Sequence, residues 1–281
     1  MRDNSKRFSA GADPVHTETS GEAGFSLDFS VPTELVDLPS KGIHYPEGSY
    51  LRGKESIEIK FMTAKDEDIL TSPTLLKKGL AIDRFLRNVI IDKKVNVKSL
   101  LTGDRNAILV TSRINGFGAE YTTKVSCPAC ATISENAFDL SEVVAYHGDD
   151  FNDHDITPTG HGTFVIKLPR TKFEVEVRLL TSKDEDELAA KMQSTTKKGS
   201  YETHLTDQLR KIIVSVNGVE ELKTINQVID VMPAFDSRYL RAAYLKTVPG
   251  LDMTQGFTCS SCGFEKEVDI PMTVDFFWSK Q

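Results

Sequence analysis

Residues 57–68 read IEIKFMTAKDED, and residues 175–186 read VEVRLLTSKDED. Each copy opens with alternating apolar and polar residues, which is the pattern of a half-buried β-strand. A threonine and a run of acidic residues follow, starting at Thr63 and at Thr181. A threonine hydroxyl can cap free backbone amides, and carboxylates favour the positive end of a helix dipole. Each copy therefore predicts a strand followed by a capped helix.

The repeat continues beyond this segment, at a larger offset. Without a gap, Asp104, Gly118, Cys127 and Cys130 align with Asp236, Gly250, Cys259 and Cys262. The extra residues of the second copy fall in a polar, glycine-containing stretch at 195–205. An apolar helical stretch (residues 75–91 and 205–216) and a helix led by aspartate (residues 104–114 and 236–248) come before the cysteines in both copies. Internal self-similarity of this kind is typical of duplicated units.

The predicted fold class is therefore α+β, with two pseudo-symmetric strand–helix–helix–zinc-knuckle repeats joined by a linker and preceded by an extended N-terminal arm. The expected boundaries are residues 1–50 for the arm, 51–146 for the first repeat, 147–170 for an acidic linker and 171–281 for the second repeat. The first thirty residues are too polar to bury a core of their own. We expect such an arm to need a partner surface, which points to a large assembly.

Each pair of cysteines forms a C-x-x-C motif between two strand-like runs, CPAC at 127–130 and CSSC at 259–262. A tight turn at the tip of a hairpin aims two thiolates at one point, and two such knuckles supply the ligands of a closed tetrahedral zinc site. We expect Cys127, Cys130, Cys259 and Cys262 to hold one structural zinc per chain and to connect the two repeats. Gly263 suits the backbone after a knuckle, whereas Ala131 fits the same place less well.

Two other interpretations of the cysteines stay open. A redox C-x-x-C motif belongs at the start of a helix in a thioredoxin-like unit, and neither pair has that context. The cysteines could also pack as small apolar residues without a metal. A site with four thiolates leaves no position for water, so zinc here would be structural and not catalytic.

Composition and motifs argue against several classes of function. The net charge is −7, whereas bulk binding of nucleic acid depends on Lys and Arg. We find no apolar run of the roughly 18–20 residues that a membrane span needs and no apolar core of a secretory signal. Serine-hydrolase and phosphate-loop motifs are absent from the sequence, so we expect no enzyme activity. The histidines and carboxylates of residues 147–155 fit a solvated linker better than a metal site.

A zinc-ribbon adaptor that binds nucleic acid or acts in transcription is the alternative function. It would need a basic face with interleaved aromatic residues near the knuckles. Only Lys124 is basic near the first knuckle, and Lys266 near the second is balanced by Glu265 and Glu267.

Several motifs together give the chain a resemblance to a known family. They are LPSKGIHYP at 38–46, TAKDED at 63–68, IDRFL at 82–86, the CPAC and CSSC knuckles, and DFFW at 275–278. From about residue 35 to the C-terminus, the sequence resembles the T-even-type (T4-like) phage baseplate protein family. The resemblance implies a non-enzymatic component of a contractile tail baseplate, at the hub or inner wedge, or a hub assembly factor. It also implies other baseplate or tail proteins as partners, assembly in the host cytoplasm and a place in the virion. It supplies no catalytic residues.

Two segments are candidates for contacts with those partners. The arm around residues 38–46 is one, as a docking element. The apolar C-terminal stretch VDFFW at 274–278 is the other, because Phe and Trp are favoured anchors at interfaces. The same aromatic residues could instead close the core of the second repeat, and the sequence leaves both readings open.

Overall fold

The computed structural model of the chain describes residues 31–197, 204–272 and 274–277. It divides the chain into residues 1–31 and residues 32–281, and all the described helices and strands belong to the second unit. The N-terminal part of the expected arm, the middle of the predicted loop at 195–205 and Trp278 lie outside the described residues.

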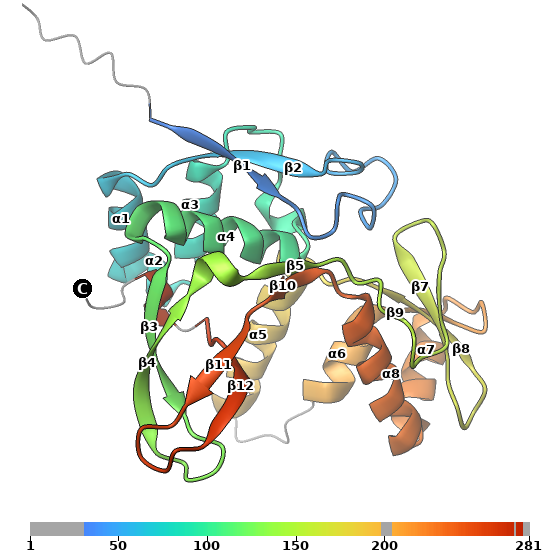
Figure 1. Cartoon of the computed structure of the whole chain (residues 1–281). Helices are drawn as coiled ribbons and strands as arrows, with labels where there is room; N and C mark the ends of the chain where they lie inside the picture. The colour runs from blue at the N-terminus through green and yellow to red at the C-terminus, as the bar shows by residue number, and fades with distance from the viewer. Residues whose placement is uncertain (1–30, 198–203, 273, 278–281) are drawn as a thin grey trace, which may run out of the picture. The chain divides into compact units, whose positions relative to one another are not determined.

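The first half of this unit begins with a hairpin and continues with helices that lead to a second hairpin (Figure 1). Its elements are β1 (Thr33–Asp37), β2 (Ser56–Lys60), α1 (Ala64–Thr71), α2 (Pro73–Lys77), α3 (Ala81–Val89), η1 (Val97–Ser99), α4 (Thr102–Phe117), β3 (Glu120–Ser126), β4 (Ile133–Asp139), η2 (Leu140–Glu142) and β5 (Val144–Tyr146).

The second half follows a similar order. Its elements are β6 (Ile156–Pro158), β7 (Thr163–Lys167), β8 (Glu174–Arg178), α5 (Ser182–Lys197), α6 (His204–Ile212), β9 (Ile213–Val216), α7 (Leu222–Val231), α8 (Ala234–Thr247), β10 (Gly250–Asp252), β11 (Thr254–Thr258), β12 (Glu265–Asp269) and η3 (Val274–Phe277).

The described part of the chain is a mixed α+β structure, as the sequence predicts. Its sheets are small and antiparallel: β1–β2, β3–β4, β11–β12, β5–β10 and the four-stranded order β6-β7-β8-β9. Buried apolar side chains from both halves form one hydrophobic cluster. Strands β5 and β10, which pair with each other, come from different halves and join them.

The two threonine-acidic motifs start helices in the same way. The hydroxyl of Thr63 donates to Asp66 Oδ2 at 2.7 Å and the Thr63 amide donates to the same oxygen at 3.0 Å. The hydroxyl and amide of Thr181 donate to Asp184 Oδ2 at 2.7 and 3.0 Å. The bonds from the two threonine amides satisfy a backbone donor at each helix start, and at the second start Asp184 N also donates to the Thr181 hydroxyl at 3.4 Å. The predicted helix starts are confirmed.

A hairpin whose two strands have five residues each precedes each of these helices. Strand β1 pairs with β2 from Thr33 opposite Lys60 to Asp37 opposite Ser56. Strand β7 pairs with β8 in the same register, from Thr163 opposite Arg178 to Lys167 opposite Glu174. The expectation was an extended arm to residue 50 and a linker to residue 170. The structure places residues 33–37 and 163–167 in these hairpins, because each segment has a neighbouring strand that satisfies its backbone groups. The expected boundaries themselves stay predictions.

A buried aspartate in the first turn of α4 holds the loop that follows β1. Asp104 accepts hydrogen bonds from the Ser40 amide (3.0 Å), the Ser40 hydroxyl (2.6 Å) and the Tyr45 hydroxyl (2.7 Å). In α8, Asp236 likewise accepts bonds from the Arg170 amide (2.9 Å), and from the Thr171 amide (2.9 Å) and hydroxyl (2.8 Å), in the loop after β7. The aspartates that align in the sequence therefore have matching partners.

Two predicted helical stretches differ from the structure. Residues 75–91 are split between α2 and α3, with Gly79 at φ +66° between them. Residues 213–216 leave the predicted helix and form β9, which pairs with β8. A short apolar run does not distinguish a buried strand from a helix. Residues 213–216 form a strand here because their backbone groups pair with the edge of β8.

None of the helices in the described part of the chain has the length and apolarity needed to cross a membrane.

Candidate metal centre

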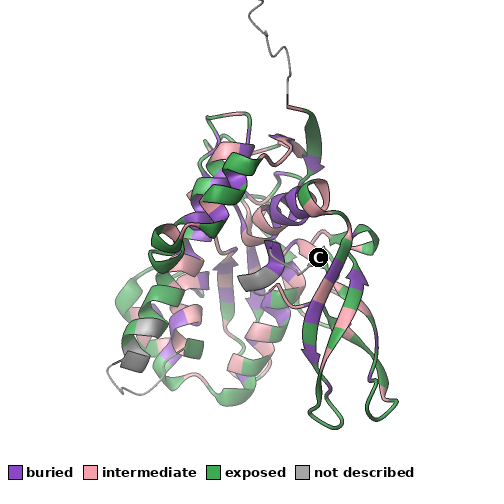
Figure 2. Cartoon of the chain, turned by 90° about the vertical axis from the view of Figure 1, so that its left-hand side faces the viewer, coloured by how far each residue is buried: buried purple, intermediate pink, exposed green. Residues whose placement is uncertain are grey.

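Two hairpins carry the cysteines, and they lie side by side (Figure 1). Strands β3 and β4 pair from Glu120 opposite Asp139 to Ser126 opposite Ile133. Strands β11 and β12 pair from Thr254 opposite Asp269 to Thr258 opposite Glu265. Buried and exposed residues alternate along β3, and the turns at the hairpin ends are exposed (Figure 2).

The two turns have the same backbone hydrogen bonds. Cys127 N donates to Thr132 O and Ala131 N donates to Cys127 O, both at 2.9 Å. In the second turn, Cys259 N donates to Phe264 O and Gly263 N donates to Cys259 O, again both at 2.9 Å.

The residue after each second cysteine adopts a left-handed backbone, with φ of 56° at Ala131 and 69° at Gly263. Only glycine adopts this conformation without a steric penalty. The first knuckle therefore bears a strain that the second avoids, in line with the weaker fit expected of Ala131.

The turns bring the four cysteines together, although the two pairs are far apart in the sequence. All four Sγ atoms lie within 4.8 Å of one another. Cys127 Sγ is 3.8 Å from Cys262 Sγ, and Cys130 Sγ is 3.7 Å from Cys259 Sγ. Cys127 and Cys259 are buried, whereas Cys130 and Cys262 are exposed. No other group of three or more His, Cys, Asp and Glu side chains of this kind occurs in the described residues.

Local hydrogen bonds favour the thiolate at two of the four cysteines, Cys130 and Cys259. The Thr132 hydroxyl, 3.2 Å from Cys130 Sγ, and the Thr132 amide lower the pKa of Cys130 to about 6. The amides of Cys262 and Ser261 lower the pKa of Cys259. The Phe264 amide lowers the pKa of Cys262, but the neighbouring thiols and burial outweigh it and raise the pKa to about 12. Thiolates are the forms that bind metals, so the turns favour metal binding at Cys130 and Cys259, and a cation would be needed to ionise Cys262.

A contact that the sequence does not signal joins the two hairpins at their bases. The side-chain amide of Gln255 in β11 accepts a hydrogen bond from Asp139 N (3.1 Å) and donates one to Asp139 O (2.5 Å). The Tyr121 hydroxyl in β3 also donates to Pro271 O at 3.2 Å. These bonds fix one hairpin against the other and so contribute to the convergence of the cysteines.

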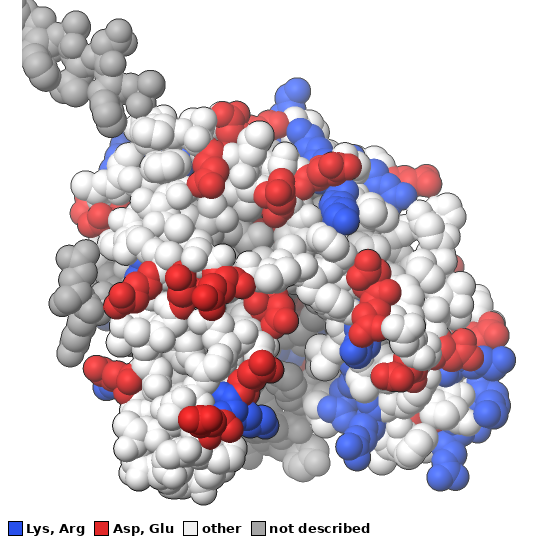
Figure 3. Space-filling view, in the orientation of Figure 1, with Lys and Arg blue, Asp and Glu red and all other residues white. Residues whose placement is uncertain are grey.

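The surface of the hairpins is acidic. Their exposed charged residues are Glu120, Lys124, Glu135, Asp139, Glu265, Lys266, Glu267 and Asp269. Acidic side chains are prominent over this side of the molecule, while Lys and Arg gather over the opposite lower part of the view (Figure 3). A surface of this charge does not attract a phosphate backbone.

The segment expected to dock partners is largely internal. Leu38, Ser40 and Tyr45 are each about 1% exposed, and the bonds to Asp104 hold this loop in place. Residues 38–46 are thus held within the fold, while Ile43 in the same loop is 55% exposed. Docking of a partner on this loop stays a prediction.

The C-terminal aromatic residues are also internal. Phe276 and Phe277 are buried. The ring of Phe277 lies 5.3 Å from that of Phe85, and the ring of Phe276 lies 5.1 Å from that of Tyr121. These two residues therefore belong to the core. Their ring partners lie in the first half of the unit, because the chain returns to that half after β12.

The linker histidines do not converge on a cation site. His147 Nδ1 is 2.8 Å from Pro39 O, and the centroid of the His154 ring lies 4.9 Å from that of Tyr239 with the rings tilted by 42°. Both rings therefore contact other parts of the fold. Residues 147–155 are less solvated than the linker interpretation expects.

Comparison with known proteins gives one match. The model of the T4 bacteriophage base plate protein family matches residues 37–278. No curated protein and no solved structure matches the chain.

Proposed function

Because the chain belongs to the T4 bacteriophage base plate protein family, we propose that it is a non-enzymatic structural or assembly component of a contractile tail baseplate. It acts through contacts with other baseplate or tail proteins, assembles in the host cytoplasm and forms part of the virion. The family match over residues 37–278 is the observation that carries this proposal.

The proposed cofactor is one structural zinc, bound by Cys127, Cys130, Cys259 and Cys262. A tetrahedral site with Zn–S bonds of about 2.3 Å has sulfurs about 3.8 Å apart. The Sγ distances of 3.8 and 3.7 Å agree with this spacing. Four thiolates fill the coordination sphere, so the ion would connect the hairpins and take no part in a reaction.

We also propose that the unit consists of two pseudo-symmetric repeats. Four matching features support it: the hairpin register at β1–β2 and β7–β8, the capped helix starts, the partners of Asp104 and Asp236, and the bonding of the two knuckles. Repeat one then begins at β1 and repeat two at β7, and each contributes two ligands to the zinc.

The alternative function, a zinc-ribbon adaptor that binds nucleic acid, has less support. The hairpins expose Lys124 and Lys266 among six carboxylates. A nucleic acid bound at the hairpins would bring its phosphates close to these carboxylates, and the like charges would repel one another.

Two measurements test the proposal. Elemental analysis of the purified chain is expected to give one zinc per chain. Cys259→Ser is expected to lose the metal and to unfold at a lower temperature, while Ser260→Ala in the same turn retains both properties. A zinc-free wild-type chain with an unchanged melting curve in Cys259→Ser would refute the metal site.

The place in the baseplate is tested in infected cells. A tagged chain is expected to co-purify with tail proteins and to be detected by mass spectrometry in purified particles or their assembly intermediates. Recovery of the chain with nucleic acid and without tail proteins would favour the alternative.

A further inference from the structure

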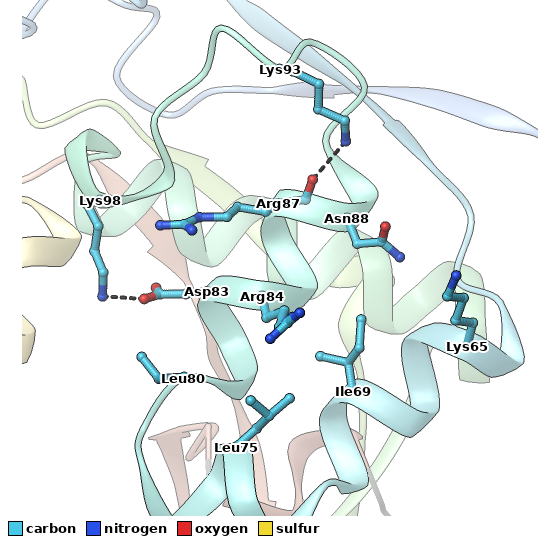
Figure 4. Close-up of a pocket in the computed structure, with 10 residues that line it drawn as sticks. All are labelled: Lys65, Ile69, Leu75, Leu80, Asp83, Arg84, Arg87, Asn88, Lys93 and Lys98. Atoms are coloured by element: carbon cyan, nitrogen blue, oxygen red, sulfur yellow. Dashed lines mark hydrogen bonds and ion pairs between the residues drawn. The ribbon is translucent and has the colours of Figure 1, made fainter.

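A cationic pocket lies on the first half, away from the cysteines. It has a volume of about 760 Å³, and its walls come from α1, α2, α3 and the segment around η1 (Figure 4). Five cationic side chains and one carboxylate line it: Lys65, Arg84, Arg87, Lys93, Lys98 and Asp83. In a chain with a net charge of −7, this is a local reversal of sign.

Part of this positive charge is already used within the fold. Lys98 forms ion pairs with Asp83 and Asp186. Lys93 Nζ donates to the carbonyl oxygens of Arg87 (2.7 Å) and Ile90 (2.6 Å). These two lysines are therefore held by internal partners.

The remaining cations have no such partner. Among the described residues, no carboxylate pairs with the side chains of Lys65, Arg84 or Arg87, and all three are exposed. Arg84 and Arg87 stand one turn apart on α3, so both guanidinium groups can reach one ligand. Each guanidinium is a rigid fork of donors suited to two carboxylate oxygens.

The corresponding helix of the proposed second repeat differs. On α6, Arg210 pairs with Asp230 (2.8 Å) and Asp207 (3.1 Å), and Lys211 pairs with Glu187. The second copy thus neutralises its cations internally, whereas the first leaves those of α3 available. Duplication of the fold alone does not explain that difference.

Apolar side chains form the other part of the pocket. Ile69, Leu75 and Leu80 lie below Arg84 in the view of Figure 4, and Leu80 is 44% exposed. A ligand with negative charge alone would leave this surface in water. A ligand that combines carboxylates with an apolar side chain would cover both parts.

We propose that this pocket binds an acidic peptide segment of a neighbouring tail protein. Its carboxylates pair with Arg84, Arg87 and Lys65, and an apolar side chain between them packs on Leu75 and Leu80. A nucleic acid fits less well, because the residues that line the pocket include no aromatic ring on which a base could stack. The inference rests on the proposed function, since the segment would come from the same baseplate.

Fluorescence anisotropy with the full zinc-loaded chain tests the chemistry. The probe is a fluorescein-labelled peptide in which glutamate pairs flank a leucine. Arg84→Gln with Arg87→Gln is expected to weaken binding by about 10- to 100-fold, which corresponds to about 1.4–2.8 kcal/mol for the two arginines together. The matched control, Lys124→Gln with Lys266→Gln, makes the same change in net charge on the exposed hairpins and is expected to change binding by about twofold or less.

Two further probes test the recognition of both parts. A peptide with serine in place of the leucine is expected to bind more weakly to the wild-type chain, and Leu80→Ser is expected to abolish the difference between the two peptides. Equal losses in the two double variants would overturn the inference. So would a single-stranded oligonucleotide of equal charge that binds as tightly and depends on the same arginines.

The proposed function can be judged separately from this inference. A chain that is found in purified tails but does not bind the peptide would overturn only the pocket. A chain absent from tails and their intermediates would overturn the baseplate role itself.

Discussion

Replacing Phe277 by alanine tests whether the C-terminal aromatic residues belong to the core. Phe277 is 4% exposed. Its ring meets Phe85 at 5.3 Å with an interplanar angle of 61°, and Phe276 at 5.2 Å and 86°. Both arrangements are edge-to-face, which is the favoured geometry of aromatic pairs.

The expected loss of unfolding free energy is large. A buried Phe→Ala change costs about 3–5 kcal/mol, and aromatic pairs add about 0.5–1.5 kcal/mol each beyond the buried area. We therefore expect a value near the upper end, about 4–5 kcal/mol. Domains are stable by about 5–15 kcal/mol in total, so the variant would lose about a quarter or more of its stability. The melting temperature would fall by roughly 10 °C or more.

Urea unfolding followed by circular dichroism measures this loss, with zinc present in every sample. The matched control is Phe235→Ala on α8, because Phe235 is 55% exposed. The control is expected to change stability by about 1 kcal/mol or less. If Phe277→Ala behaved like the control while tail assembly failed, the packing argument would be refuted and the terminus would be an interface anchor.

Three further predictions concern Asp184 at the start of α5, Ala131 after the first knuckle and Gly103 in α4. Burial alone would raise the pKa of Asp184, but bonds from Arg178 and Thr181 outweigh it and hold the pKa well below its usual range. Asp184→Asn should therefore lower the free energy of unfolding by about 2–4 kcal/mol at neutral pH. Asp66→Asn should lower it by less, because the ion pair of Asp66 with Lys60 is longer, at 3.4 Å. The difference from wild type should fade in unfolding curves as the pH drops below about 4, where the unfolded carboxyl becomes protonated. Ala131→Gly should stabilise the zinc-loaded chain by up to about 1 kcal/mol in urea unfolding, because φ is 56° there; a loss would contradict the left-handed turn. Gly103→Ala should destabilise the chain by about 1–3 kcal/mol or more, because its Cβ would lie 2.0 Å from Pro249 O. Gly116→Ala in the same helix meets only the flexible side chain of Met62 and should be neutral or slightly stabilising; equal effects would contradict the close packing of α4.

The features that the sequence predicts well are local. Thr63 and Thr181 precede acidic residues within one helical turn, so their capping bonds depend only on neighbours in the chain. The knuckles are local turns as well. The convergence of Cys127 and Cys259 is not local, and it could be predicted only because the repeat aligns the two pairs.

The features that the sequence does not predict depend on distant partners. Ser40 and Tyr45 lie in a stretch rich in Pro and Gly, which has the composition of a loop or arm. They are buried because Asp104, more than fifty residues away, requires hydrogen-bond donors. Phe277 is another example, since its burial depends on where the chain returns after β12 and not on the aromatic run itself.

The hairpins explain where a metal would contribute most. A two-stranded hairpin is only marginally stable by itself, and both knuckles lie at the exposed ends of such hairpins. At their bases, Gln255 bonds to Asp139 and Tyr121 bonds to Pro271, so the bases remain joined without an ion. At their ends, the four cysteines are the groups that bring the turns together. Loss of the metal would therefore loosen the hairpin ends first, because nearby thiolates repel one another when no cation compensates their charge. The shared core, which both halves build, would open only at greater cost. A zinc in this position would fix the separation of the two knuckles, and so the shape that the acidic hairpin surface presents to a neighbouring protein.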